Sequence, residues 1–234
     1  KHALRRYARR VGRDGIASDR DWEGVRLHVV TGKGGTGKTT VAAALALALA
    51  AGGRRTLLVE CEGRQGLAQL FGAPPLPYAE RRVAVAPDDG IVYGLPIDPE
   101  VAPLEYFDLY YHLSPAGRAL SRFGAIDFAT TIAPGVRDVL LTGKAYEATR
   151  RRASSRATRT AASPGRSDDP DAYVYDAVVM DAPPTGRVAR FLNVNSEVAG
   201  LARVGPVNKQ AESIMHLIRS PQTVVHLVTL LEEM

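Results

Sequence analysis

Short apolar runs separated by helical patterns organise this sequence. Runs rich in leucine and β-branched residues predict buried strands at 26–31, 55–61, 173–181 and 223–230. Segment 90–97 is a further strand candidate, and Pro96 within it favours an edge strand or a short one. Helical patterns predict helices at 38–51, 187–203 and 207–219.

The first of these runs predict the type of sheet. Residues 26–61 contain a strand, a helix and a second strand, and the right-handed crossover of such a unit makes its two strands parallel. Helices then cover the faces of the sheet. The sequence therefore predicts an α/β domain with a mainly parallel, doubly wound sheet over residues 25–234.

The remaining stretches predict connections and an attached lobe. Residues 1–24 are charged and lack periodicity, which predicts a flexible basic lead-in, and 72–89 indicate mainly a connection with a candidate short strand at 82–86. A largely helical tract at 99–152 is longer than one crossover and predicts a helical insertion subdomain beside the sheet. Residues 153–172 contain no large apolar side chain and predict a disordered loop.

An aromatic cluster lies inside the helical tract, at 104–113. Such a cluster forms either the core of the lobe or an exposed groove for a client or partner protein, and the sequence leaves both interpretations open.

The segment between the first strand and helix carries the clearest chemistry. Gly32 to Thr39, G-K-G-G-T-G-K-T, fits the pattern GxxxxGK[ST] of a phosphate-binding loop. Its glycines let backbone N–H groups turn inward around a phosphate, and the helix beginning at Lys38 adds its unpaired N–H groups. Lys38 is expected to neutralise the phosphates and the Thr39 hydroxyl to ligate Mg²⁺. A second lysine, Lys33, need not point at the phosphate of its own loop.

Acidic residues follow two of the predicted strands. Glu60 and Glu62 end the run at 55–61, and Asp181 ends the run at 173–181 in the manner of a Walker B strand, whose carboxylate holds Mg²⁺. Alternation sends Glu60 and Glu62 to the same side, where they either orient a water beside the phosphates or are solvated loop acids.

The segment after Asp181 reads A-P-P-T-G. Pro183 and Pro184 stiffen the exit from the strand, Thr185 follows, and Gly186 leaves a hinge. This composition suits a segment that senses the terminal phosphate.

Charge and cysteine content narrow the function classes. The net charge is +5 and the pI about 9.5, but residues 1–13 and 148–167 hold twelve basic residues and no acid, which leaves 18 basic against 25 acidic residues elsewhere. This distribution argues against nucleic acid as the partner of the domain, although the two basic segments fit either solubilising tails or contact with a polyanion or membrane surface. The single cysteine, Cys61, excludes a disulfide or a C-x-x-C zinc clip within one chain. Without a long apolar stretch or an apolar signal core, the expected location is the cytoplasm.

Three segments together resemble a known family. K-G-G-T-G-K-T-T (Lys33 to Thr40) resembles the deviant Walker A loop of the ParA/MinD/ArsA-type ATPases, and D-A-P-P-T-G (Asp181 to Gly186) is similar to switch II of the ArsA and guided-entry branch. E-C-E-G-R-Q-G-L-A-Q-L-F (Glu60 to Phe71), followed by a helical insertion, fits switch I of that branch. The sequence therefore resembles the bacterial ArsA-like anion-transporting ATPases, which have a P-loop NTPase fold.

The resemblance implies a nucleotide-sandwich dimer that binds ATP and Mg²⁺. It implies that Lys33 reaches the partner's ATP, that Lys38 contacts the bound phosphates, and that Glu62, one methylene longer than the family's aspartate, positions the attacking water. It also implies that Thr39 and Asp181 form the Mg²⁺ site. The nucleotide-binding residues would be Gly34, Gly35, Thr36, Gly37, Lys38, Thr39 and Thr40, with the switch II segment formed by Pro183, Pro184, Thr185 and Gly186.

The resemblance also implies partners. These are a second copy or a paralogous ATPase, and a client protein that could be membrane-associated. The sequence departs from the family in two respects: it lacks the C-x-x-C of the eukaryotic targeting factor, so no zinc is expected, and its single cysteine cannot form an arsenite-type metal site. The adenine-contacting segments and the C-terminal part of the family fold would lie beyond these residues.

The predicted function is a Mg²⁺-dependent ATPase that couples hydrolysis to opening and closing of a dimer, and thereby to binding or delivery of a client. Two alternatives remain open at this point. One is a ParA/MinD-type positioning ATPase acting on DNA or membrane, which the basic segments favour. The other is a nucleotide-gated scaffold with weak hydrolysis.

Overall fold

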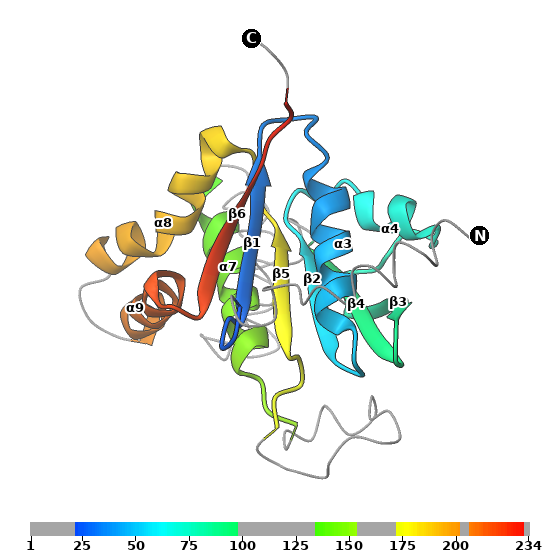
Figure 1. The fold of residues 1–234 in the computed structure, drawn as a ribbon. Helices are drawn as coiled ribbons and strands as arrows, with labels where there is room; N and C mark the ends of the chain where they lie inside the picture. Colours follow the sequence, from blue (N-terminus) through cyan, green and yellow to red (C-terminus); the bar gives the residue numbers. More distant parts are fainter. Residues whose placement is uncertain (1–21, 98–133, 154–171, 202–205, 232–234) are drawn as a thin grey trace, which may run out of the picture.

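The computed structural model describes residues 22–97, 134–153, 172–201 and 206–231. A six-stranded sheet of order β3-β4-β2-β5-β1-β6 runs through its centre (Figure 1). All neighbouring strands are parallel except β3, which is antiparallel to β4. The strands are β1 (Leu27–Gly32), β2 (Arg55–Glu60), β3 (Arg81–Ala86), β4 (Gly90–Pro96), β5 (Ala177–Asp181) and β6 (Thr223–Val228).

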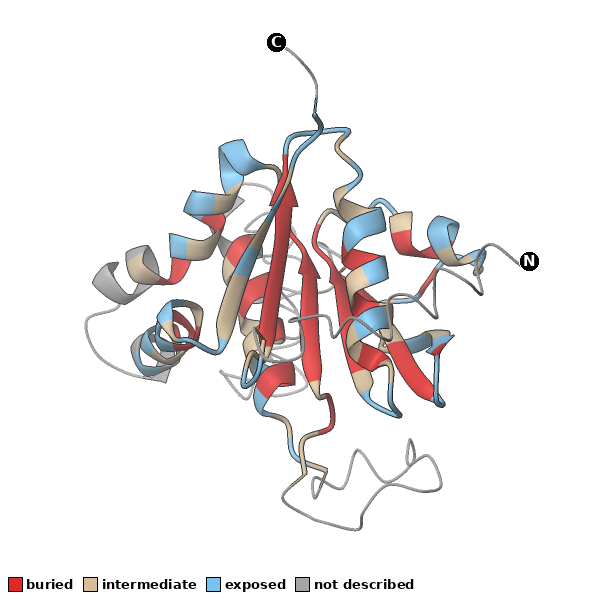
Figure 2. Cartoon of the chain, viewed as in Figure 1, coloured by how far each residue is buried: buried red, intermediate tan, exposed pale blue. Residues whose placement is uncertain are grey.

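Helices cover both faces of the sheet (Figure 1). One face carries α3 (Lys38–Ala50) and α4 (Gly66–Phe71), and the other carries α7 (Pro134–Arg150), α8 (Thr185–Leu201) and α9 (Pro206–Arg219). Alternation along the strands explains the two layers, because Val29 packs with α7, α8 and α9 whereas its neighbour Val30 packs with α3 and α4. Figure 2 shows β1, β2 and β5 buried between these layers, as a doubly wound sheet requires.

The predicted α/β fold with its mainly parallel sheet is thus confirmed, with differences at two strands. The strand expected at 173–181 begins only at Ala177. Segment 90–97 forms β4, but the expectation of an edge strand is wrong, because β3 pairs with its outer side. Pro96 is tolerated as the last residue of β4, where a missing N–H interrupts little of the ladder. The hairpin between β3 and β4 turns at Asp88 and Asp89, both with positive φ, as tight hairpin turns require.

Only the end of the predicted helical insertion at 99–152 lies within the described residues. There α7 contributes Leu141, Ala145 and Ala148 to the core against the sheet, so this portion is a crossover helix of the main domain. The aromatic cluster at 104–113, most of the basic lead-in at 1–24 and most of the loop at 153–172 lie outside the described residues. No helix in the described ranges is long and apolar enough to span a membrane.

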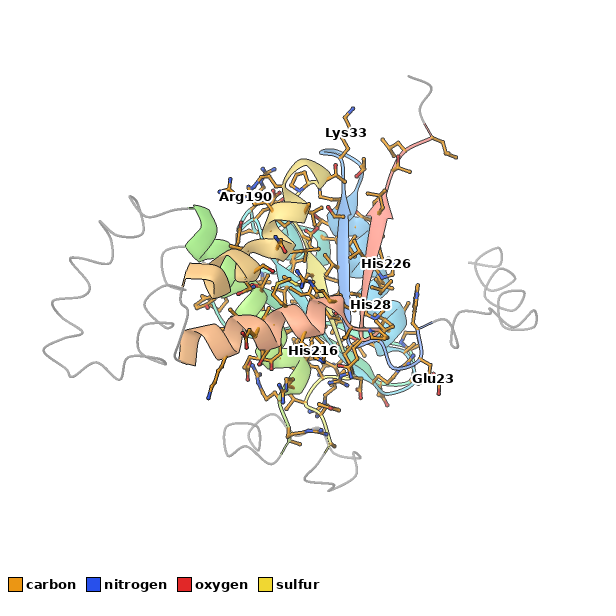
Figure 3. The ribbon with its side chains drawn as sticks, turned by 90° about the vertical axis from the view of Figure 1, so that its left-hand side faces the viewer. Glu23, His28, Lys33, Arg190, His216 and His226 are labelled. Atoms are coloured by element: carbon orange, nitrogen blue, oxygen red, sulfur yellow. The ribbon has the colours of Figure 1, made fainter. Side chains whose placement is uncertain are left out.

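A cluster of three rings lies where β1 and β6 meet. The His28 Nδ1 and His226 Nε2 atoms are 3.0 Å apart, their rings stack, and Trp22 packs edge-on against both (Figure 3). Burial, assisted by His226, lowers the pKa of His28 to about 4, and burial also lowers the pKa of His226. From the sequence, His226 and His216 are expected to be core or surface residues rather than ligands. In the structure His226 belongs to this cluster, and His216 is exposed on α9.

A single aromatic ring, that of Tyr173, is packed between two arginines just before β5. The Tyr173 ring lies between the guanidinium groups of Arg26 and Arg152, each 3.6 Å from the ring centroid. Beside it, the N–H of Ala153 donates to the carbonyl of Ala172 at 2.8 Å. These contacts hold the chain at 153 next to the chain at 172.

Candidate nucleotide-binding site

The glycine-rich loop joins the end of β1 to the start of α3 at the carboxyl edge of the sheet (Figure 1). Gly35 and Gly37 have φ of +82° and +81°, a region that suits glycine, and a Cβ added at Gly34, Gly35 or Gly37 would meet no atom within 4 Å. The loop backbone is therefore uncovered at these glycines, which suits close approach of a phosphate.

The first turn of α3 is free to bind an anion. Its N-cap is Gly37, which provides no side-chain hydrogen bond to the helix N–H groups. The glycine-rich loop that precedes α3 contains a hydrogen bond of its own, because the Thr36 hydroxyl donates to the carbonyl of Lys33 at 2.8 Å. The Lys38 ammonium lies 3.5 Å from the same carbonyl oxygen, so its charge lies over the loop. This region therefore presents N–H groups and a cation towards one space.

Lys33 and Thr40 behave differently from the rest of the loop. Both are exposed, and Figure 3 shows the Lys33 side chain at the tip of the loop pointing away from the sheet. The Lys33 ammonium is thus available to a neighbouring molecule. Its predicted role across a dimer remains a prediction, since only one chain is described.

Gly32, the last residue of β1, allows the end of β6 to lie close to the glycine-rich loop. A Cβ added there would lie 2.2 Å from the carbonyl oxygen of Val228 and 2.9 Å from the Thr36 hydroxyl oxygen. Only glycine fits at this position, so the loop depends on the close approach of β6.

The centre of the site is a contact between helix and strand. The Thr39 hydroxyl, in the first turn of α3, donates to Oδ2 of Asp181 at 2.7 Å, while Oδ1 of Asp181 is buried and has no hydrogen-bond partner. An unpaired buried carboxylate oxygen beside a threonine hydroxyl fits a divalent cation, because hydroxyl and carboxylate oxygens are ligands of Mg²⁺. The two predicted metal residues, 142 positions apart in sequence, are therefore brought together.

The electrostatics of Asp181 agree with this fit. Its pKa is raised chiefly by burial and further by Glu60 and Glu62, against the lowering effects of the Thr39 hydrogen bond and Lys38. Three carboxylates therefore gather at the carboxyl edge of the sheet. A bound cation would relieve their mutual repulsion.

Glu60 and Glu62 have separate environments. Glu62 is partly exposed and pairs loosely with Arg64, with 3.7 Å between the Arg64 Nε and Glu62 Oε2 atoms. Glu60 is only 2% exposed, and its carboxylate accepts hydrogen bonds from the N–H groups of Gly66 and Leu67 in α4. The interpretation of both as solvated loop acids is therefore wrong for Glu60, which contacts backbone N–H groups.

The predicted switch II segment is held against β1. The Thr31 hydroxyl donates to the carbonyl of Pro183 at 2.7 Å, and the N–H of Ala182 donates to the carbonyl of Val30 at 2.9 Å. The carbonyl of Pro184 then accepts from Val188 at 3.0 Å and begins α8.

The start of α8 differs from the sequence prediction. The helix begins at Thr185, two residues before the predicted start, and Gly186 lies in its exposed first turn. The hinge expected at Gly186 is consequently a helical residue in this conformation.

Sequence reasoning missed two contacts of this site. One is the capping of α4 by Glu60; the signal is that Gln65 and Gly66 provide no side-chain cap of their own. The other is the side-chain amide of Gln65, which both donates to and accepts from the backbone of Leu76, at 3.1 Å and 2.8 Å. No local pattern points to Leu76 as its partner.

Comparison with known proteins agrees with this geometry. Residues 25–233 match the family described as anion-transporting ATPase. The chain is 59% identical over 209 residues to "ATPase BagA" of Mycobacterium tuberculosis and to "Putative ATPase Mb3704" of Mycobacterium bovis, covering 89% of this chain and 57% of each relative. It is 28% identical over 193 residues to "Putative arsenical pump-driving ATPase" of Prosthecochloris vibrioformis, covering 79% of this chain and 40% of that protein.

The mycobacterial relatives are considerably longer, and this chain spans little more than half of their length. The family match nevertheless spans residues 25–233, which include the phosphate loop and the predicted switch I and switch II segments. With the loop, the Thr39–Asp181 contact and the parallel sheet in place, the chain belongs to the anion-transporting, ArsA-like ATPase family.

Proposed function

We propose that this chain is the ATP-hydrolysing part of a Mg²⁺-dependent switch ATPase. The contact between Thr39 and Asp181 carries the proposal, because it places a hydroxyl and an unpaired carboxylate oxygen at the uncapped start of α3. That arrangement gives one space for a cation beside another for phosphates. The family match supports ATP as the nucleotide.

Each residue has a proposed task. Backbone N–H groups of Gly34, Gly35 and Gly37 bind the phosphate oxygens, and Lys38 neutralises their charge. Thr39 and Asp181 hold Mg²⁺, which when bound would neutralise charge on the terminal phosphates.

Glu62 is proposed to orient the attacking water. The difference in burial supports it over Glu60: the Glu62 carboxylate is partly exposed, whereas the Glu60 carboxylate is buried against α4. A water held by Glu62 would be able to exchange with solvent, because this carboxylate is partly exposed.

Lys33 is proposed to act on the ATP of a partner chain, which would be a second copy or a paralogous ATPase. Its exposure and outward direction support this, because neither would be needed if it bound the phosphate of its own loop. Hydrolysis would then occur only in the closed dimer, and dimer opening would couple the nucleotide state to binding or delivery of a client protein.

Phosphate release by the full-length natural protein tests the metal site. We expect hydrolysis in the presence of Mg²⁺, its loss on chelation with EDTA, and its loss in Asp181→Asn, which removes the carboxylate charge while keeping the acceptor for Thr39. Hydrolysis that continues at the wild-type rate in Asp181→Asn would refute the proposed metal role.

A second experiment tests the role of Lys33. Lys33→Ala should bind ATP almost as the natural protein does but hydrolyse it about 10³-fold more slowly, in the range known for charge-stabilising groups supplied by a partner. Lys209→Ala, which removes an exposed lysine on α9, is the matched control and should keep full activity. Equal turnover in Lys33→Ala and Lys209→Ala would refute the cross-dimer role.

The same assays distinguish the other two functions. Tight binding of Mg²⁺–ATP without phosphate release would favour a nucleotide-gated scaffold. ATP-dependent, salt-sensitive binding to DNA or anionic vesicles would favour a positioning ATPase.

A further inference from the structure

Glu60 is the buried acid next to the site to which the mechanism above gives no task. It ends β2, is 2% exposed, and its carboxylate extends away from the strand towards the first turn of α4. Oε1 accepts from the N–H of Gly66 at 2.9 Å, and Oε2 lies 3.5 Å from the nitrogen of Leu67. One carboxylate thus closes the loop 61–65 upon itself.

The local sequence leaves α4 dependent on this distant acceptor. Gln65 occupies the N-cap position with φ of 56° and makes no capping hydrogen bond, because its amide is bonded to the backbone of Leu76. Gly66 has no side chain. Without Glu60, the N–H groups of the partly buried Gly66 and the buried Leu67 would lose this partner, which is costly for the buried one.

The same carboxylate stands beside the metal residues. Glu60 and Asp181 are register partners in the pairing of β2 with β5, and the N–H of Cys61 donates to the carbonyl of Asp181 at 3.3 Å. Gly66 also lies against α3, since a Cβ added to it would be 3.5 Å from Cγ2 of Thr39. The start of α4 is therefore fixed relative to both Thr39 and Asp181.

We propose that Glu60 is a positioning residue that holds the loop 61–65, and with it Glu62, in place beside the cation and phosphate space. The inference rests on the proposed hydrolysis of ATP. Glu60 acts through the backbone of α4, because both of its oxygens face N–H groups of that helix. Loss of its carboxylate should release the loop while the phosphate loop itself stays formed.

The rate of trypsin cleavage within the loop 61–65 measures how often the loop opens. Arg64 is the only lysine or arginine between Arg55 and Arg81, and its side chain is 79% exposed, so cleavage after it reports opening of the loop. In Glu60→Ala of the full-length protein we expect this cleavage to be about 10- to 100-fold faster, the effect of losing hydrogen bonds to a charged acceptor when opening is at equilibrium.

Two further variants make the measurement specific. Glu60→Gln keeps an oxygen acceptor for Gly66 but not the second, and should give a smaller increase, below about 10-fold. It also keeps the side-chain shape, so it remains informative if Glu60→Ala does not fold. Gln69→Ala changes an exposed residue of α4 and should leave cleavage after Arg64 unchanged.

Steady-state kinetics then separate positioning from a merely structural role. In Glu60→Ala we expect kcat to fall at least 10-fold, KM for ATP to change less than threefold, and Glu60→Gln to recover part of kcat, because only the loop carrying Glu62 is released. A fall in kcat with wild-type cleavage after Arg64 would overturn the proposal and make Glu60 a direct participant. Wild-type cleavage and kcat in both variants would overturn it as well.

Failure of the proposed function gives a different result. If the natural protein releases no phosphate, the ATPase assignment fails, whereas cleavage after Arg64 still measures whether Glu60 holds the loop.

Discussion

The buried histidine pair predicts that acid destabilises this domain, in large part through His28. The pKa of His28 falls from 6.5 to about 4 on folding, so between these pH values the unfolded chain binds a proton that the folded chain does not. The stability that neutral His28 contributes is therefore fully present above pH 6.5 and is lost as the pH falls towards 4. Each pH unit within this window lowers the free energy of unfolding by about 1.4 kcal/mol.

The variant His28→Phe isolates this contribution. Phenylalanine keeps a ring between Trp22 and His226 but cannot bind a proton, so any packing cost it causes is the same at every pH. Between pH 7.5 and pH 5, the natural protein should lose about 2 kcal/mol more than His28→Phe. Titrating groups that do not contact His28 are common to both proteins and cancel in the difference, and His226, which His28 contacts, is the coupled group among the described residues.

Urea unfolding followed by circular dichroism at pH 7.5, 6.5, 5.5 and 5 measures that difference. Fluorescence of Trp22, the only tryptophan of the chain, should report the same transition because its ring contacts both histidines. His216→Phe replaces an exposed histidine and should follow the natural protein at every pH. The reasoning is refuted if the stability difference between the natural protein and His28→Phe does not change with pH.

Two further substitutions test close contacts in the fold. Gly32→Ala should lower the free energy of unfolding by about 2 kcal/mol or more, because its Cβ would lie 2.2 Å from the carbonyl oxygen of Val228, whereas Gly34→Ala enters open space and should leave urea unfolding unchanged. Tyr175→Phe removes the hydroxyl that donates to Glu80 at 2.5 Å and should cost about 1.5–3 kcal/mol in the same assay, and a midpoint equal to that of the natural protein would contradict this.

The parts of the site that sequence alone predicts are those set by local pattern. The glycine spacing of the loop, the helix beginning at Lys38 and the acid ending β5 each follow from a few neighbouring residues. Parallel pairing then brings Thr39 and Asp181 together, because carboxyl ends of parallel strands share one edge of the sheet.

The parts that sequence missed depend on distant partners. The candidate strand at 82–86 is present as β3, but its pairing with the outer side of β4 was not predicted, although Asp88 and Asp89 are typical hairpin-turn residues. His28 and His226 are 198 residues apart, and no periodicity of either strand specifies that their rings will stack. Glu60 gave an ambiguous signal, since an acid after β2 fits either a group that orients a water or a solvated loop acid, and its capping of α4 was not predicted.

The contacts of Tyr173 with Arg26 and Arg152, together with the Ala153–Ala172 hydrogen bond, form a clamp that also makes the domain suitable for protein engineering. Because folded residues hold the chain at 153 and 172 together, each doubling of the chain length between those positions should cost only about 0.6 kcal/mol of closure entropy. The clamp lies at the amino end of β5, whereas the phosphate loop lies at the carboxyl edge of the sheet. A folded reporter domain inserted between 153 and 172 would therefore label the protein at the edge remote from its nucleotide site.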